Sequence, residues 1–342
     1  MGNANNAIVN YLSDKKRFAD MINAEVYGGR QVIKPEGLTE ISATTYTKKG
    51  KTGNTAPPKR RERRGDLAML YEDGTMYRMF LAEAQNKVMY VLPVRSMDYL
   101  VSAYKKQLDD MSREHERKCD YGSIAEQFSG INKTDKLKPV YLLWVYHGEE
   151  KWDGAESLKD MVDLGDDKDG FNKIFQDFKA HIIKINEMKD TSNYNTELKS
   201  LLDLLRIRAD KNALKKLVNE DEKFYNMDEE TYETAAVLLN APSIWRKRRK
   251  YKADMEGRTY NMCKALRDWE AEITEEKNKI IDEQNAQLEQ KNAQLEQKNA
   301  QLEQQNAQLE QQNAQLEQKD ALIDSLEKEN AMLKARLEAA GL

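Results

Sequence analysis

Three side chains in one short stretch, two carboxylates and a carboxamide, carry oxygen atoms that could together bind a divalent metal ion. Asp66 is followed by Glu83 and then Gln85, in the pattern D-x16-E-x-Q, and an Asp73-Gly74 pair lies between them. An Asp-Gly pair between two β-prone runs is a strong signal for a β-hairpin. The pattern therefore predicts two antiparallel strands that carry the acidic residues at the end away from the turn.

A two-residue turn at Asp73-Gly74 would place Leu81 opposite Asp66. Opposed residues share a face and side chains alternate along a strand, so Glu83 and Gln85 are expected on the face of Asp66. A three-residue turn would reverse this parity. Two nearby carboxylates repel each other unless a cation lies between them, and Mg²⁺ or Mn²⁺ prefers such oxygen ligands. From the residues alone, the alternative is an amphipathic hairpin with acidic residues at its solvated end.

Two basic clusters could contact a nucleic-acid backbone. Residues 48–64 carry eight positive charges and one negative charge, and residues 245–252 interleave six positive charges with aromatic residues. Both patterns are typical of phosphate-binding surfaces, although a solvated helix whose long side chains cover apolar surface would look similar to the second. The candidate DNA-binding residues in these clusters are Lys59, Arg60, Arg61, Arg63, Arg64, Arg246, Arg248 and Arg249.

Several blocks in order along the chain resemble the recombination-promoting nuclease (Rpn) family, also described as PD-(D/E)XK nuclease family transposases. The blocks span about residues 5–272, and the most specific is RRGDLAMLYEDG followed by FLAEAQNKVMYVLPVRSMDYLVSAYKKQ. Further similar blocks are FADMINAEVYGGRQVIKPEGLTEI, KPVYLLWVYHGEEKWDGAESLKDM and NMCKALRDWEAE. The resemblance implies an α/β, restriction-endonuclease-like core with the element order α-β-β-β-α-β.

The resemblance also implies roles for individual residues. Asp66, Glu83 and the backbone carbonyl of Ala84 would bind Mg²⁺ or Mn²⁺, and Gln85 stands where the wider superfamily has a catalytic lysine. A metal ion at such a site activates water for attack on phosphate. Glu25 is a candidate acidic helper on the first helix, although a surface charge there would look the same.

The helix expected after the hairpin carries three more residues in positions similar to recurrent polar residues of the family. Arg95 is a candidate phosphate contact, Gln107 a candidate support for the site, and Tyr99 lies between them. A partly solvated helix face is the alternative.

Our reading of the local sequence agrees with the α-β-β-β-α-β order and predicts the elements that position these residues. They are a helix at 5–24, strands at 30–34, 66–72 and 76–85, a helix at 94–110 and a strand at 138–147. We interpret residues 1–150 as the nuclease core, 151–272 as a mainly helical region that completes it, and 273–342 as a heptad-repeat tail.

The tail contains five copies of NAQLEQ, which begin at Asn285 and recur every seven residues. Leucine at heptad position d and asparagine at position a predict a parallel coiled coil over 274–337, and hence a homodimer or higher homo-oligomer. A disordered Gln/Asn-rich tether is the alternative.

Composition limits the remaining function classes. The 342 residues have a net charge of -4 and only two cysteines, so neither a disulfide framework nor a strongly charged whole-protein surface is expected. No apolar run is long enough for a membrane span, and the first residues lack a signal-peptide pattern, so we expect a cytoplasmic protein. The sequence has no Walker or Rossmann fingerprint, so no small-molecule cofactor is expected. The sequence favours a metal-dependent DNA endonuclease; the alternative is a non-cleaving DNA-binding or coiled-coil scaffold protein on a nuclease fold.

Overall fold

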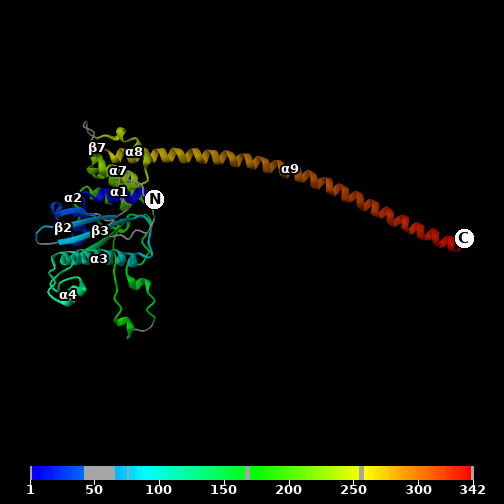
Figure 1. The fold of residues 1–342 in the computed structure, drawn as a ribbon. Coiled ribbons are helices and arrows are strands. Elements are labelled where there is room, and N and C mark those ends of the chain that lie inside the picture. The colour runs from blue at the N-terminus through cyan, green and yellow to red at the C-terminus, as the bar shows by residue number, and fades with distance from the viewer. Residues whose placement is uncertain (1, 42–65, 75–76, 166–169, 254–257, 340–342) are drawn as a thin grey trace. The chain divides into compact units, whose positions relative to one another are not determined.

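The computed structural model describes residues 2–41, 66–74, 77–165, 170–253 and 258–339. The chain divides into two compact units, Met1–Trp269 and Glu270–Leu342. The first unit is a layered α/β arrangement around one mixed sheet (Figure 1). Within the ranges given, no helix combines the length and the apolar character needed to cross a membrane.

Five strands form the sheet of the first unit, in the order β1-β2-β3-β4-β5. The first three are antiparallel neighbours, whereas β3, β4 and β5 run parallel. Parallel neighbours need a crossover connection, and α3 supplies it between β3 and β4. The strands are β1 (Leu38–Ile41), β2 (Asp66–Glu72), β3 (Tyr77–Gln85), β4 (Val140–Tyr146) and β5 (His181–Lys184).

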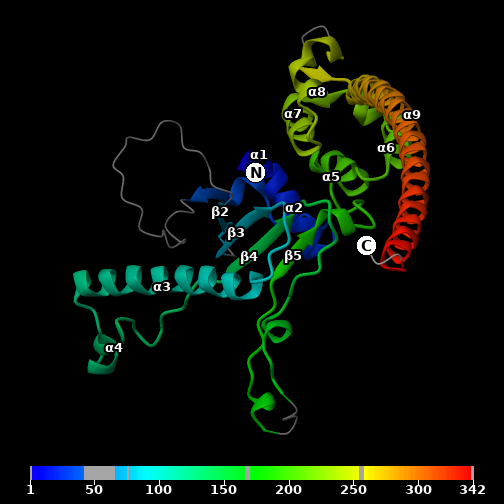
Figure 2. The ribbon, with the colours of Figure 1, turned by 90° about the vertical axis from the view of Figure 1, so that its right-hand side faces the viewer.

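Helices cover both faces of the sheet (Figures 1 and 2). α1 (Gly2–Leu12) and α2 (Lys15–Tyr27) lie on one face, and α3 (Leu92–Lys118) lies on the other. Alternation along the strands sorts the buried side chains between two cores. Phe80 belongs to the larger core under α1 and α2, whereas Leu81 and Trp144 belong to the smaller core under α3.

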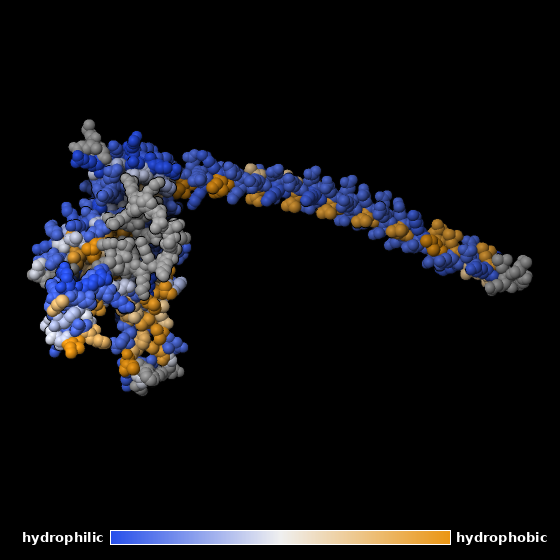
Figure 3. Space-filling view, viewed as in Figure 1, coloured by the Kyte–Doolittle hydropathy of each residue, from blue (hydrophilic) through white to orange (hydrophobic). Residues whose placement is uncertain are grey.

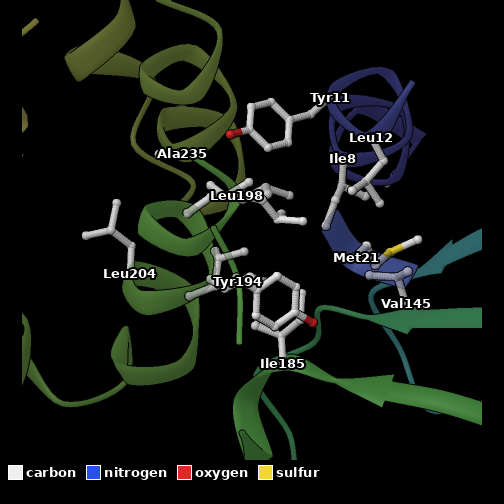
Figure 4. Close-up of a cluster of buried hydrophobic side chains, with 14 of the residues drawn as sticks. Ile8, Tyr11, Leu12, Met21, Val145, Ile185, Tyr194, Leu198, Leu204 and Ala235 are labelled. Carbon is white, nitrogen blue, oxygen red and sulfur yellow. The ribbon is translucent and has the colours of Figure 1, made fainter. Parts of the chain in front are cut away.

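The larger core joins the N-terminal helices to helices that follow residue 150. Figure 4 shows Ile8 and Tyr11 of α1 beside Leu198 of α5 and Ala235 of α7. The Tyr11 hydroxyl also lies 2.7 Å from the Thr231 hydroxyl of α7. Residues before and after position 150 therefore contribute to one hydrophobic core.

Among the described residues after β4, short 3-10 turns and the strand β5 come first, and α-helices begin only at Leu198. The four-residue strand β5 was not predicted, because its apolar run is only Ile182 and Ile183, too short to show a periodicity. Besides α4 (Ile124–Ser129), the remaining elements of the first unit are α5 (Leu198–Ile207), α6 (Lys211–Glu220), α7 (Glu229–Leu238), α8 (Pro242–Arg246), β6 (Met227–Asp228), β7 (Thr259–Tyr260) and the 3-10 turns η1 (Pro35–Gly37), η3 (Leu158–Met161), η4 (Phe171–Lys173), η5 (Ile185–Glu187), η6 (Glu222–Tyr225) and η7 (Arg248–Tyr251).

The helix predicted at 5–24 is two helices with a break at Asp14. The Asp14 carboxylate accepts hydrogen bonds from the backbone N–H groups of Lys16, at 3.0 Å, and Arg17, at 3.1 Å. Such a carboxylate satisfies backbone donors that have no partner in the first turn of a helix. Asp14 therefore begins α2 as a separate helix.

The strand predicted at 30–34 is wrong, and the first strand is β1, further along the chain. The Asn23 side chain uses the backbone polar groups that a strand at this position would need. Its carbonyl oxygen accepts from the N–H groups of Val32 and Ile33, at 3.1 and 2.8 Å, and its amide donates to the Ile33 carbonyl at 2.9 Å. This segment is therefore anchored to α2, and pairing with β2 starts only at Leu38.

The other predicted elements of the core are present. β2 has the predicted bounds, β3 begins one residue later than predicted, and β4 is shorter by two residues at its start and one at its end. The predicted helix at 94–110 extends to Leu92–Lys118, and Cys119 ends it with a left-handed φ of 52°.

α9 (Met262–Ala339) is a continuous helix of 78 residues, which from Glu270 onward makes up most of the second unit. The prediction that the repeats are helical is confirmed, and a disordered tether is not what the structure shows. Hydrophobic side chains recur along the helix (Figure 3), and the repeat leucines are 54–58% exposed.

Candidate active site

The β2–β3 hairpin pairs Asp66 directly with Glu83. The predicted pairing of Asp66 with Leu81 is wrong by two residues, because four residues rather than two separate the strands. Gly74 has a φ of +83°, but Asp73 lacks the positive φ that a two-residue type I′ turn also requires.

The register shift is an even number of residues, so the predicted face of β3 is retained. Glu83 and Gln85 both lie on the face of the sheet that α3 covers, beside Leu81 of the smaller core. Position 66 is directly opposite Glu83 in the ladder, whereas the predicted register placed it diagonally. The backbone positions of these two residues are therefore closer together than predicted.

Glu83 is a buried carboxylate, with 5% of the residue exposed. Its Oε1 accepts a hydrogen bond from Gln85 Nε2 at 3.1 Å and forms an ion pair with Arg95 of α3. A carboxylate this far from water requires a positive partner or strong donors to remain ionised. Arg95 supplies that charge, and the pair ties α3 to β3.

Two aromatic rings position Arg95. Its guanidinium carbon lies 5.5 Å from the ring centroid of Tyr99 and 5.4 Å from that of Trp144, and Nη2 donates to the Tyr99 hydroxyl at 3.1 Å. Trp144 in turn donates from Nε1 to Ser96 Oγ at 2.8 Å. The Arg95 side chain is 37% exposed, so it connects the buried Glu83 to the surface.

Asp66 and Ala84, the other predicted metal ligands, are placed by their backbone. Asp66 is the first residue of β2, and its side chain lies outside the described part of the chain. Ala84 follows Glu83 in β3, and its methyl group is buried in the larger core on the opposite face. The hairpin thus brings together the side chains of Glu83 and Gln85 with the backbone positions of Asp66 and Ala84.

The structure does not bring Glu25 together with this group. Glu25 lies on α2, on the other face of the sheet, and its Oε1 accepts a hydrogen bond from the Tyr194 hydroxyl at 2.6 Å. Burial and the Glu25 carboxylate both raise the pKa of Tyr194, so the tyrosine stays protonated as the donor. This contact links α2 to the segment that precedes α5.

The basic residues fall into three places. Arg95 contacts Glu83. The basic run before β2 lies outside the described residues and contains Lys59, Arg60, Arg61, Arg63 and Arg64. The second cluster does not form the predicted helix, because α8 ends at Arg246 and a 3-10 turn follows. Arg248 stacks 3.8 Å from the Trp245 ring centroid, and Arg246 and Arg249 are exposed. This cluster lies on the opposite side of the sheet from α3 (Figures 1 and 2).

Gln107, the proposed support for the site, instead holds the start of β4. Its Nε2 donates to the Lys138 carbonyl at 3.1 Å, and its Oε1 accepts from the Lys138 N–H at 2.8 Å. Because Gln107 is twelve residues beyond Arg95, it lies about 18 Å further along the helix axis. It therefore stabilises the crossover rather than the carboxylates.

Sequence reasoning missed the contact between Trp144 and Arg95 and the role of Ser96. Trp144 is a core side chain, with 1% of the residue exposed. Its position beside Arg95 follows from the packing of α3 on β4, for which no local pattern gives a signal. The Ser96 hydroxyl accepts from the indole and donates to the Leu92 carbonyl at 2.8 Å, so it links the strand to the first turn of α3.

The oxygen atoms at this site suit a hard divalent cation as ligands, since they belong to carboxylate, carboxamide and backbone carbonyl groups. Among the side chains that the structure describes, no group of three or more His, Cys, Asp or Glu residues converges to bind a metal. A divalent ion at Glu83 would therefore depend on Asp66 and the Ala84 carbonyl as further ligands. It would also compete with Arg95 for the Glu83 carboxylate.

Comparisons with known proteins find no relative: no family model, no curated protein and no solved structure matches this chain.

Proposed function

We propose that this protein is a metal-dependent DNA endonuclease of the recombination-promoting nuclease type, with its active site at the Glu83 end of the β2–β3 hairpin. The observation that carries the proposal is the direct pairing of Asp66 with Glu83, to which Gln85 is hydrogen-bonded. These are the residues that the resemblance assigns to the metal-binding motif. The order α2, β1, β2, β3, α3, β4 supports a PD-(D/E)XK core.

In this proposal Asp66, Glu83 and the Ala84 carbonyl bind Mg²⁺ or Mn²⁺. Such an ion, when bound, polarises the scissile phosphate and lowers the pKa of a coordinated water. Gln85 orients a water or a phosphate oxygen through its carboxamide. Because Gln85 is neutral, it supplies none of the positive charge that a lysine would direct at the transition state.

Arg95 has two functions in the proposed site. It neutralises the buried Glu83 carboxylate before DNA and metal bind. Its partly exposed guanidinium then pairs with a DNA phosphate, for which arginine is well suited because it can donate two parallel hydrogen bonds. The basic run at 59–64 is proposed to contact the DNA backbone further along.

A non-cleaving DNA-binding or scaffold protein on the same fold is the second candidate. The Glu83–Arg95 ion pair favours it. A carboxylate that already has a cationic partner can have a purely structural role, which here is to attach α3 to the sheet. Glutamine at position 85 points the same way, because the positive charge used for cleavage in the wider superfamily is missing.

Cleavage of supercoiled plasmid distinguishes the two candidates. We expect nicked or linear product from the wild type with Mg²⁺ or Mn²⁺ and none with EDTA. Asp66→Asn and Glu83→Gln should each reduce the rate at least about 100-fold, as is typical when a group that stabilises charge in the transition state is removed. Glu72→Gln is the matched control, since Glu72 is an exposed acid at the other end of β2.

Loss of activity in Glu83→Gln could reflect lost structure, so far-UV circular dichroism and the melting temperature are measured for each variant. Gln85→Ala gives an independent test, because Gln85 is only partly buried. Full cleavage by folded Asp66→Asn or Glu83→Gln would refute the assignment. Metal-independent DNA binding without cleavage by any form would favour the second candidate.

A further inference from the structure

The apolar side chains of α9 from Ile281 to Ile323 are about half exposed in the single chain. Leu288, Leu295, Leu302, Leu309 and Leu316 recur every seventh residue, and each is 54–58% exposed. The stripe continues at both ends with Ile281 and Ile323, which are 51% and 52% exposed. A regular apolar stripe of this length on a helix in water favours burial against another helix.

The residues between these leucines determine which helix fits. Asparagine occupies each a position, from Asn285 to Asn313. In a parallel, in-register pair, asparagine meets asparagine and leucine meets leucine, and the paired amides can hydrogen-bond across the interface. In an antiparallel pair, a positions meet d positions, so each buried asparagine would face leucine without a hydrogen-bonding partner.

The charged positions beside the stripe favour the same arrangement. Every e position of the repeats is glutamate, and the g positions include Lys291 and Lys298. In a parallel pair these lysines meet Glu296 and Glu303 of the other helix. An antiparallel pair would instead oppose e with e, and therefore glutamate with glutamate along the whole interface.

We propose that a second copy of this chain covers the stripe, forming a parallel two-stranded coiled coil over residues 274–337. The buried asparagines favour two strands over three or four. Because α9 is continuous from Met262, parallel pairing places the N-terminal ends of both helices, where each chain enters its first unit, at one end of the coiled coil. This proposal is independent of the nuclease proposal.

The identical repeats leave the register to the ends of the coiled coil. A shift of seven residues again pairs asparagine with asparagine and lysine with glutamate, at the cost of one unpaired repeat. Ile281 and Ile323 flank the repeats and form layers that differ from the leucine layers. A shifted pair would set these isoleucines against leucine, so they favour the in-register pair. Loss of a whole heptad should therefore shorten the interface without changing the pairing chemistry.

Sedimentation equilibrium of the full-length chain tests the pairing. The wild type should be a dimer, and Leu302→Asp with Leu309→Asp should weaken dimerisation at least about 100-fold by placing charge in two layers. Gln301→Asp with Gln308→Asp adds the same charge on the outer side of the helix and should leave the dimer intact. A monomeric wild type, a trimer, or a dimer that survives the leucine substitutions would overturn the proposal.

Cysteine cross-linking tests the orientation. In a Cys119→Ser background, which removes the exposed native cysteine, Leu288→Cys should form a covalent dimer under mild oxidation. Gln290→Cys, on the outer side of the helix, is the control and should cross-link far more slowly. If Leu288→Cys cross-links no faster than this control while the protein is dimeric, parallel in-register pairing is wrong.

Discussion

His147 makes the stability of the first unit sensitive to acid. It follows the last residue of β4 and is 3% exposed, and its Nε2 lies 2.8 Å from the Asn5 Oδ1 of α1. Arg208 donates to the His147 carbonyl at 2.6 Å. Burial, reinforced by the positive charge of Arg208, lowers the pKa of His147 from 6.5 to about 4.

The direction of the pH effect follows from the difference between the His147 pKa in the unfolded chain and in the folded chain. The unfolded chain takes up a proton near pH 6.5, whereas the folded chain resists protonation until about pH 4. The stability from neutral His147 is therefore fully present above pH 6.5 and is lost as the pH falls toward 4. The pKa difference corresponds to at most about 3 kcal/mol, of which about 2 kcal/mol is lost between pH 7 and pH 5.

Urea unfolding of the wild type and of His147→Gln at pH 7 and pH 5 measures this contribution. All four tryptophans, at positions 144, 152, 245 and 269, belong to the first unit, so their fluorescence reports its unfolding. The wild type should lose about 2 kcal/mol more than His147→Gln over this interval. His181→Gln, which removes an exposed histidine from β5, should lose as much as the wild type. Equal losses in the wild type and His147→Gln would refute the reasoning.

Three further results are expected. Arg95→Met should lower the free energy of unfolding by about 2 kcal/mol, since it leaves the Glu83 carboxylate buried without its cation, and Glu83→Gln in the same chain should restore part of the loss in urea titrations. A hydrogen bond to Asp120 raises the pKa of His115, so the contact stabilises the end of α3 below pH 6.5 and weakens as the pH rises through that raised pKa. Hydrogen exchange in the last turn of α3, corrected for its intrinsic pH dependence, should then accelerate from pH 6 to pH 8 in the wild type but not in Asp120→Asn; equal acceleration would contradict this role. Deletion of residues 292–298 should leave the protein dimeric by sedimentation, and a monomer would show that the repeats are not interchangeable.

Local patterns predicted the strands of the β2–β3 hairpin, the helix that follows it and the helical tail. In each case the signal lies within a few residues: alternation around Asp73-Gly74, a helical period after Pro93, and a heptad repeat from Asn285. The same alternation placed Glu83 and Gln85 on one face of the sheet. These features depend on contacts between near neighbours in the chain, which a sequence pattern records directly.

Contacts between distant segments were decided only by the tertiary structure. Asn23 anchors the segment at 32–33 and so moves the first strand to β1, and β5 is a strand only because β4 offers it a partner.

The ion pair of Glu83 with Arg95 likewise depends on how α3 packs on the sheet, and this packing also places Trp144 beside the guanidinium. The sequence by itself determined which residue types could form a site and on which face of the hairpin they lie. The tertiary structure decided that Glu83 is opposite Asp66, is buried and is already neutralised, because turn length, burial and ion pairing arise from packing that no local period encodes.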